Sequence, residues 1–374
     1  MRRLWDRIVE MLWWVFLAQR ALARRLVSDV QAVAEERRVL GIFHFQEHGA
    51  YLGDMVEFLA ILNVLRARHS LQKVDLCYVD DPTNPNQPVT RHRIDSSASY
   101  KEMMLDLRAL LPCVGEVFHF NADRDFELFF RANYRRYVCW PRYRYLHSWP
   151  SRVNYNRMST RGIAYPNTYA PLYRYFDAHG DLPHLTCPPD ALEWANSLVR
   201  THVSPAVPVA VQIRFNADSP YRNTDLDAWH EFFARMETHG PVKFVLISRR
   251  EEIVPKLREL KNIVYAKDHD SNVLQDLAMV QVAHFSMFTD SGFSIYPWFC
   301  GLPTVAFGKN KNEFPLARMQ DETGQSIRFL SSFQRRFWGD YRADDLVAGF
   351  LSLWNDLAAT GWTNPYRDDP TRRT

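Results

Sequence analysis

The stretch VLGIFHFQEHGAYLGDMVEFLAILNVL at residues 39–65 decides the fold. Its first residues are mostly apolar and β-prone, so they predict a buried strand at 39–45. Gly49 and Gly53 then permit a tight turn, after which helical spacing of apolar residues predicts a helix at 52–68. A strand, a turn and a helix in this order form the unit of which parallel α/β sheets are built.

The same alternation recurs along the chain. The first half contains further predicted strands at 73–79 and 113–118 and a helix near 100–110. The second half contains predicted strands at 207–215, 242–247, 262–265, 284–288 and 304–307, and predicted helices at 227–238, 251–260, 273–282, after Gly292 and at 343–357. The sequence therefore predicts an α/β protein with two Rossmann-like, doubly wound domains that face a cleft.

Changes in composition suggest where these domains begin and end. We expect an N-terminal amphipathic helical segment at 1–38 and a first Rossmann-like domain at 39–178. A Pro-rich linker at 179–206 leads to a second Rossmann-like domain at 207–342, and a C-terminal helix and tail occupy 343–374. Ligands of open α/β sheets bind beyond the carboxyl ends of the strands, so the search for chemistry narrows to the strand-to-helix turns.

Composition excludes several classes of protein. With 374 residues, 47% hydrophobic and 24% charged, the chain is neither disordered nor a polytopic membrane protein. Its five cysteines are far apart and odd in number, which favours a reducing compartment and argues against a disulfide scaffold or a cysteine metal site.

The formal charge of +3 conceals two basic segments. Residues 1–38 contain eight Arg, and six of them flank eight consecutive apolar residues, fewer than the roughly 20 that a bilayer span needs. This segment suits attachment to a membrane surface, and packing on the protein's own core is an equal alternative.

Residues 128–176 interrupt the alternation as an insertion with nine Arg, nine Tyr and no acidic residue. That composition suits an anionic acceptor or a membrane surface, and simple packing against the acidic body is the alternative. No nucleic-acid-binding fold signature accompanies it, so we expect no nucleic-acid partner.

Two turns carry the candidate chemistry. Asp54 lies near the start of the first predicted helix, where it either caps the helix or acts as a carboxylate base at the cleft. The turn TDSGFS at 289–294 places Asp290, Ser291 and Gly292 between a strand and a helix, which suits a phosphate group. Three cations follow strands of the same predicted sheet: Arg214, Arg222 and Lys309. Together with the turn they predict a diphosphate site.

These residues form a pattern that resembles the heptosyltransferase-like (ADP-heptose:LPS transferase) glycosyltransferases of the GT-B fold. The pattern consists of YLGDM at 51–55, Arg222 ahead of Trp229, and TDSGFS followed by the strand LPTVAFG at 302–308. The family's His after its D-[ST]-G turn is absent here, because Ile295 follows Ser294, and Arg222 replaces a Lys. The stretch VQIRF at 211–215 is more weakly similar to the HxR strand of GT-B fucosyltransferases, with Gln212 in place of the His.

The resemblance implies an inverting, metal-independent transfer from a nucleotide-diphosphate sugar to a hydroxyl of a cell-surface glycan or lipid-linked glycan. Asp54 would be the catalytic base. The donor diphosphate would be bound by the second domain, and the acceptor by the first. We assign the donor to Arg214, Arg222, Ser248, Asp290, Ser291, Gly292 and Lys309, and the acceptor to His48, Tyr51, Arg142 and Arg144.

The nucleotide-sugar is a co-substrate, so no cofactor or metal is expected, although 268–270 spells the DxD motif of metal-dependent glycosyltransferases. Such an enzyme would be cytoplasmic, with peripheral attachment to the inner face of the membrane as an open alternative. Two other functions fit the same architecture: a sugar-nucleotide epimerase or hydrolase, and a non-catalytic glycosyltransferase-like binding protein.

Overall fold

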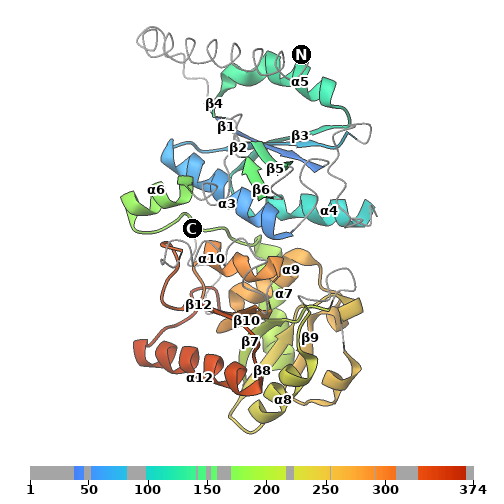
Figure 1. The fold of residues 1–374 in the computed structure, drawn as a ribbon, viewed down its shortest axis with the longest axis vertical. Coiled ribbons are helices and arrows are strands. Elements are labelled where there is room, and N and C mark those ends of the chain that lie inside the picture. The colour runs from blue at the N-terminus through green and yellow to red at the C-terminus, as the bar shows by residue number, and fades with distance from the viewer. Residues whose placement is uncertain are drawn as a thin grey trace. The chain divides into compact units, whose positions relative to one another are not determined.

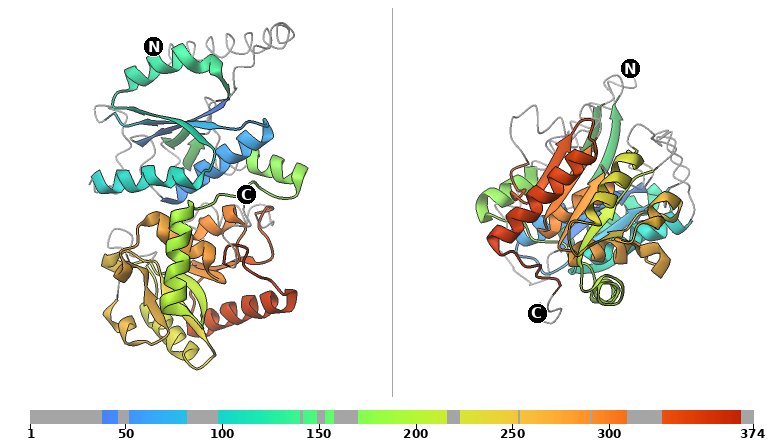
Figure 2. Two further views of the ribbon diagram at one scale, coloured as in Figure 1. Left: turned by 180° about the vertical axis from the view of Figure 1, so that it is seen from behind. Right: turned by 90° about the horizontal axis from the view of Figure 1, so that it is seen from below.

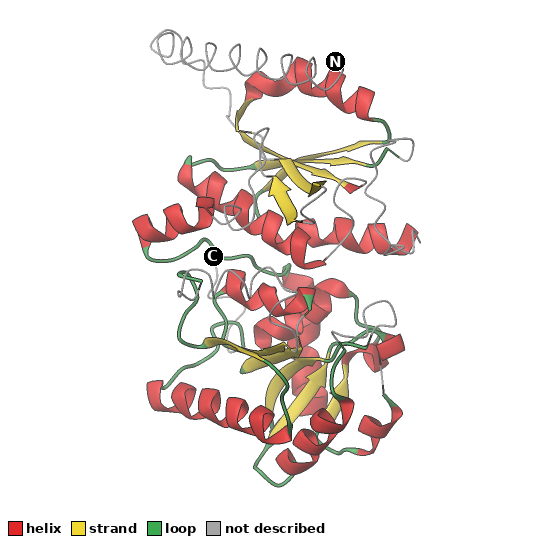
Figure 3. Cartoon of the chain, in the orientation of Figure 1, coloured by secondary structure: helices red, strands yellow, loops and turns green. Residues whose placement is uncertain are grey.

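The computed structural model describes residues 38–45, 52–81, 98–139, 142–148, 153–157, 170–215, 223–252, 254–289, 291–308 and 327–367. All of them belong to the compact unit Arg38–Thr374, and the predicted N-terminal helix lies outside them. Two sheets with helices on both faces make up this unit (Figures 1 and 3).

The first sheet has the strand order β3-β2-β1-β5-β6, and β4 also pairs with β1. Its strands are β1 (Arg38–His44), β2 (Val74–Val79), β3 (Val114–Phe120), β4 (Tyr137–Cys139), β5 (Arg142–Ser148) and β6 (Val153–Arg157). The pairs β1·β2, β2·β3, β1·β4 and β1·β5 are parallel, and β6 runs antiparallel to β5. Its helical segments are α3 (Leu52–Arg68), α4 (Ala98–Asp106), η1 (Leu107–Leu110), α5 (Asp123–Asn133), η2 (Tyr134–Arg136) and α6 (Ala170–His179).

The second sheet has the order β12-β11-β10-β7-β8-β9, and all of its pairs are parallel. Its strands are β7 (Val207–Gln212), β8 (Val242–Leu246), β9 (Ile263–Tyr265), β10 (Phe285–Thr289), β11 (Thr304–Gly308) and β12 (Gln334–Trp338). In chain order this arrangement is 6-5-4-1-2-3, that of a dinucleotide-binding fold read from its other edge. The strand order therefore reverses between β7 and β10, the topological switch point at which such sheets bind ligands.

Helices follow the strands of this sheet on both faces, as the views from behind and below show (Figure 2). Its helical segments are α7 (Pro189–Leu198), η4 (Val199–Val203), α8 (Leu226–Met236), η6 (Arg250–Glu252), η7 (Pro255–Glu259), η8 (Ala266–His269), α9 (Val273–Val282), η9 (Gly292–Ile295), α10 (Tyr296–Cys300) and α12 (Ala343–Thr360). In the described ranges, no helix is long and apolar enough to cross a membrane.

The predicted α/β class with two parallel sheets is confirmed, and α3 and α9 have the predicted bounds. The helix predicted at 251–260 is wrong: two 3₁₀ turns stand there, because Pro255 forces the preceding Val254 into an extended conformation. No strand was predicted at 334–338, where β12 forms the edge of the second sheet. The basic segment 128–176, predicted as an insertion, contributes β4 and β5 to the first sheet, beside β1.

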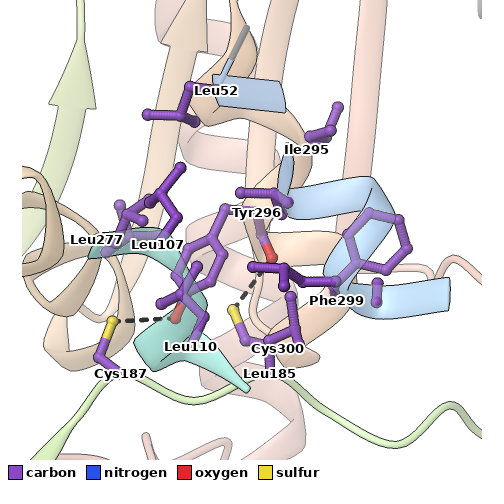
Figure 4. Close-up of a cluster of buried hydrophobic side chains, with 14 of the residues drawn as sticks. Leu52, Leu107, Leu110, Leu185, Cys187, Leu277, Ile295, Tyr296, Phe299 and Cys300 are labelled. Atoms are coloured by element: carbon purple, nitrogen blue, oxygen red, sulfur yellow. Dashed lines mark hydrogen bonds between the residues drawn. The ribbon is translucent and has the colours of Figure 1, made fainter. Parts of the chain in front are cut away.

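A continuous apolar core joins the two sheets. Figure 4 shows Leu52 of α3 together with Ile295 of η9 and with Tyr296, Phe299 and Cys300 of α10. All of these side chains belong to one buried cluster that also contains the first sheet's β1 and β2. The Tyr296 hydroxyl lies 3.1 Å from Cys187 Sγ, which gives the buried phenol a hydrogen-bond partner. The core therefore positions the N-terminus of α3 against η9.

Candidate active site at the switch point

The carboxyl ends of β7 and β10 lie side by side at the switch point. Gln212, the last residue of β7, pairs in register with Phe288, and the Thr289 hydroxyl donates to the Gln212 carbonyl oxygen at 3.4 Å. Arg214 follows β7, and Ser291 and Gly292 follow β10. Three residues predicted for donor binding, Arg214, Ser291 and Gly292, therefore come from the two strands that flank the switch point.

The first turn of α3 is in direct backbone contact with this position. A Cβ atom on Gly292 would lie 2.7 Å from Gly53 N, and one on Gly53 would lie 3.0 Å from Gly292 Cα. Only two glycines allow the turns to approach so closely, because real Cβ contacts shorter than 3.0 Å essentially do not occur. The half-buried Asp54, next to Gly53, is thereby brought to the turn that was predicted to hold the diphosphate.

Side chains of η9 and β12 stabilise the turn at Ser291. Ser294 is fully buried, and its hydroxyl donates to the Ser291 carbonyl oxygen at 2.7 Å. Arg336 of β12 donates to the Ser294 hydroxyl at 2.6 Å and lies over the rings of Trp298 and Trp338. The sequence analysis missed Arg336, since it predicted no strand at this position. The segment that follows is short, a 3₁₀ turn and a five-residue helix, so any anion here would be bound by local N–H groups rather than by a long helix dipole.

On the other side of β7, side chains connect the loops that follow β7 and β8. The Ser248 hydroxyl accepts from Ile213 N at 3.0 Å and donates to Ile213 O at 2.9 Å. Glu252 accepts from Phe215 N at 3.3 Å and from Arg249 N at 3.2 Å, and burial raises the pKa of its carboxyl group. Ser248, predicted for donor binding, is thus buried and bonded to the residue that follows β7. The exposed Phe215 ring, at 51% exposure, is a feature of this rim that the sequence analysis did not single out.

The remaining predicted site residues fall into two groups. Arg142 and Arg144 lie in β5, where Ile42 and Phe43 of β1 pair with residues 142 and 143. They are therefore placed by register at the carboxyl end of β1, from which the chain continues toward Asp54. The other predicted residues lie outside the described ranges: His48, Tyr51, Arg222, Asp290 and Lys309.

Both acidic residues of the DxD stretch are bonded to arginine side chains. Asp268 receives two hydrogen bonds from Arg258, at 2.7 and 2.9 Å, and Asp270 receives one from Arg250 at 2.6 Å. The rings of His269 and His202 are tilted against each other with centroids 4.1 Å apart. Among the residues that the structure describes, no group of three or more His, Cys, Asp or Glu side chains is arranged to hold a metal ion.

Two Rossmann-like sheets whose strand-end turns meet define the GT-B architecture. The structure is similar to that of the ADP-heptose LPS heptosyltransferase II of E. coli, with a TM-score of 0.52 and 10% identity, over 86% of this chain and 99% of that one. It is similar also to a glycosyl transferase family 9 protein from Veillonella parvula DSM 2008, with a TM-score of 0.50 and 11% identity, over 86% of this chain and 98% of that one. No family model and no curated protein matches the sequence.

At such low identity this likeness concerns the fold. The resemblance to heptosyltransferase-like proteins that the sequence motifs indicated is confirmed at that level, since the same architecture is found over nearly the whole length of both solved structures.

Proposed function

We propose that the protein is a glycosyltransferase that uses a nucleotide-diphosphate sugar and a hydroxyl acceptor. The observation that carries this proposal is the contact between Gly53 and Gly292. It sets the first turn of α3, which carries the proposed base Asp54, against the turn after β10 at the switch point, where folds of this kind bind nucleotides. A base beside a diphosphate site is the arrangement that transfer from an activated sugar requires.

The proposed reaction is an inverting displacement. Asp54 takes the proton of the acceptor hydroxyl, and the resulting oxygen attacks the anomeric carbon of the donor sugar. The bond from that carbon to the diphosphate oxygen breaks, and the departing diphosphate retains the electron pair. Arg214, together with Arg222 and Lys309, would stabilise the charge that develops on the leaving group. Cations of this kind suit a mechanism without a metal ion, and metal independence is part of the proposal.

The acceptor would enter from the first sheet. We propose that it is a cell-surface glycan or a lipid-linked glycan, bound by His48 and Tyr51 and by the basic segment with Arg142 and Arg144. Nine Arg without an acidic residue between 128 and 176 suit an anionic acceptor. For such an acceptor we place the enzyme in the cytoplasm, with the basic residues 1–38 available for attachment to the membrane surface.

Substitution of Asp54 by Asn tests the proposal, because it removes the base and preserves the size of the side chain. We expect a loss of transfer of at least about 100-fold, in the range that general-base catalysis contributes. Nucleotide binding, measured by calorimetry with ADP, GDP and UDP, should remain at the wild-type level. Glu127→Gln is a matched control, since Glu127 is an exposed acid on α5. Unchanged transfer by Asp54→Asn would rule out the mechanism. Donor conversion without acceptor would indicate an epimerase or hydrolase.

A further inference from the structure

Two buried side-chain oxygen atoms at the switch point have no hydrogen-bond partner within the described part of the chain. They are Gln212 Oε1, on a residue only 4% exposed, and Ser291 Oγ, on a residue 6% exposed. Neither atom is bonded to any part of the chain that the structure describes. Buried polar atoms in folded proteins nearly always have partners, so each exception calls for an explanation. These two exceptions lie at or just beyond the ends of β7 and β10, the strands that flank the ligand-binding crevice of the fold.

The orientation of the Gln212 amide is fixed by its neighbour. Gln212 Nε2 donates to the Ile213 carbonyl oxygen at 3.0 Å. Because a carbonyl oxygen can only accept, the amide nitrogen must occupy that position and Oε1 must be the atom that is left over. The Ser248 hydroxyl bonds to the same Ile213 oxygen at 2.9 Å, which holds that oxygen in place. Gln212 therefore offers a hydrogen-bond acceptor of defined position.

The two atoms differ in the chemistry that they can bind. An amide oxygen accepts only, so its ligand partner must carry a donor. The oxygens of a diphosphate at neutral pH are acceptors and would be repelled by Gln212 Oε1. A hydroxyl group can donate to it. The Ser291 hydroxyl, in contrast, can donate to a phosphate oxygen. A ligand that satisfies both atoms has an anionic group with a hydroxyl-bearing ring beside it.

We propose that Gln212, which no motif assigned to the donor, recognises a hydroxyl group of the nucleotide-sugar beside the Ser291 turn that the motifs assigned to the diphosphate. Gln212 Oε1 binds a hydroxyl of the ribose or of the transferred sugar, and the Ser291 hydroxyl binds the diphosphate. This inference rests on the proposed function and deepens it, since it names a residue that selects for a hydroxyl group on the donor. Gln212 determines specificity for a ligand with a hydroxyl group, whereas Ser291 contributes to the binding of any diphosphate.

The test compares ligands with and without hydroxyl groups on the folded, full-length protein. Calorimetry would measure ADP, GDP and UDP, their 2′-deoxy and 3′-deoxy forms, the corresponding nucleotide-glucose donors, and inorganic pyrophosphate. Gln212→Met should weaken binding of the hydroxyl-bearing ligand about tenfold, the effect of one neutral hydrogen bond, and leave pyrophosphate binding unchanged. Ser291→Ala should weaken binding of pyrophosphate and nucleotides by a similar factor.

The deoxy ligands identify the source of the hydroxyl. If wild type discriminates against a deoxynucleotide and Gln212→Met does not, the hydroxyl belongs to the ribose. If the wild-type protein discriminates only between the nucleotide and its sugar conjugate, the hydroxyl belongs to the transferred sugar. Gln334→Met is the matched control: Gln334 is also buried, but its amide bonds the Pro297 and Leu302 carbonyl oxygens at the amino end of β12. It should keep wild-type affinities.

Two results would overturn the proposal: wild-type affinities in Gln212→Met, or an equal loss for pyrophosphate and for nucleotides, which would indicate a purely structural role. If the Met variant fails to fold, the wild-type protein carries the test. Equal affinities for each nucleotide and its deoxy forms, together with equal affinities for each nucleotide and its sugar conjugate, would equally refute the proposal. Failure of the proposed function looks different: nucleotide binding would follow this pattern, and the wild-type protein would transfer no sugar to any hydroxyl acceptor. A wild type that binds no diphosphate would refute both.

Discussion

The contact between Gly53 and Gly292 predicts a specific response to a single added methyl group. In Gly292→Ala, the new Cβ would lie 2.7 Å from Gly53 N and 3.4 Å from the Leu52 Cβ. Neither glycine has a positive φ, so alanine is compatible with the local backbone at both positions. The effect of the substitution therefore comes from the contact between the two turns and not from backbone strain.

The magnitude follows from what the methyl group meets. A backbone nitrogen cannot move aside as a side chain can, so α3 and η9 must separate by several tenths of an ångström. Overpacking of this kind typically costs about 1–3 kcal/mol of the free energy of unfolding. The effect on transfer should be larger, because a displacement of roughly 1 Å in a catalytic group can lower the rate about 100-fold. In Gly53→Ala the new Cβ would meet Gly292 Cα at 3.0 Å, so this variant should be milder.

The assay pairs urea unfolding with sugar transfer by the same preparations. Gly349→Ala is the control, since its new Cβ would lie 2.8 Å from the Phe307 ring in the second core and away from the turns. The control should lose stability and keep its turnover, whereas Gly292→Ala should lose turnover in excess of any loss of stability. Wild-type turnover in a folded Gly292→Ala protein would refute the argument that this contact positions Asp54.

Two further predictions concern stability. The carboxylate of Asp75, fully buried at the amino end of β2, accepts hydrogen bonds from Arg38 at 3.0 Å and from Tyr137 at 3.3 Å. Asp75→Ala should therefore lower the free energy of unfolding in urea by about 3 kcal/mol and leave nucleotide binding unchanged. A loss below about 1 kcal/mol would contradict this prediction. Burial raises the pKa of Asp276 to about 6, against the opposing effect of Lys267. Because the raised pKa favours the protonated form, the stability from this group is present below about pH 4 and is lost as the pH rises through 6. The loss is about 3 kcal/mol by the usual conversion of pKa shifts, and urea curves at pH 4.5 and 7.5 should show a smaller change in Asp276→Asn than in wild type; equal changes would exclude Asp276 as the source.

Local patterns in the sequence were sufficient where burial alone decides the structure. The helix α3 is buried along most of its length, and its apolar spacing fixed both of its ends. The strands of the second sheet up to β11 are apolar runs bounded by turn residues, so they too were predictable. Because parallel strands end at one edge of a sheet, the same patterns predicted that Asp54, Arg214 and Ser291 follow strand ends. They did not predict which side chains lie next to them.

Features that depend on tertiary partners escaped prediction. The strand β12 reads QRRFW, and its two adjacent arginines resemble a solvated loop. In the structure Arg335 bonds to Asp356 and Ser352 of α12, and Arg336 lies over the rings of Trp298 and Trp338. The partners of Arg335 on α12 lie at least 17 positions away, and Arg336 also contacts Ser294 and Trp298 on other elements, which no local pattern reveals.

Gln212 shows the same limit at the proposed site. In the sequence it only stands where the HxR strand of GT-B fucosyltransferases has its His. Its role depends on the strand order, which sets β7 beside β10, and on the Ile213 carbonyl oxygen, which fixes the amide and leaves Oε1 without a partner. A histidine could present a donor at this position, whereas the amide oxygen presents only an acceptor. The replacement therefore changes which ligand group can be bound at the switch point, and a Gln212→His variant should exchange the preference for a hydroxyl for one toward an anionic oxygen.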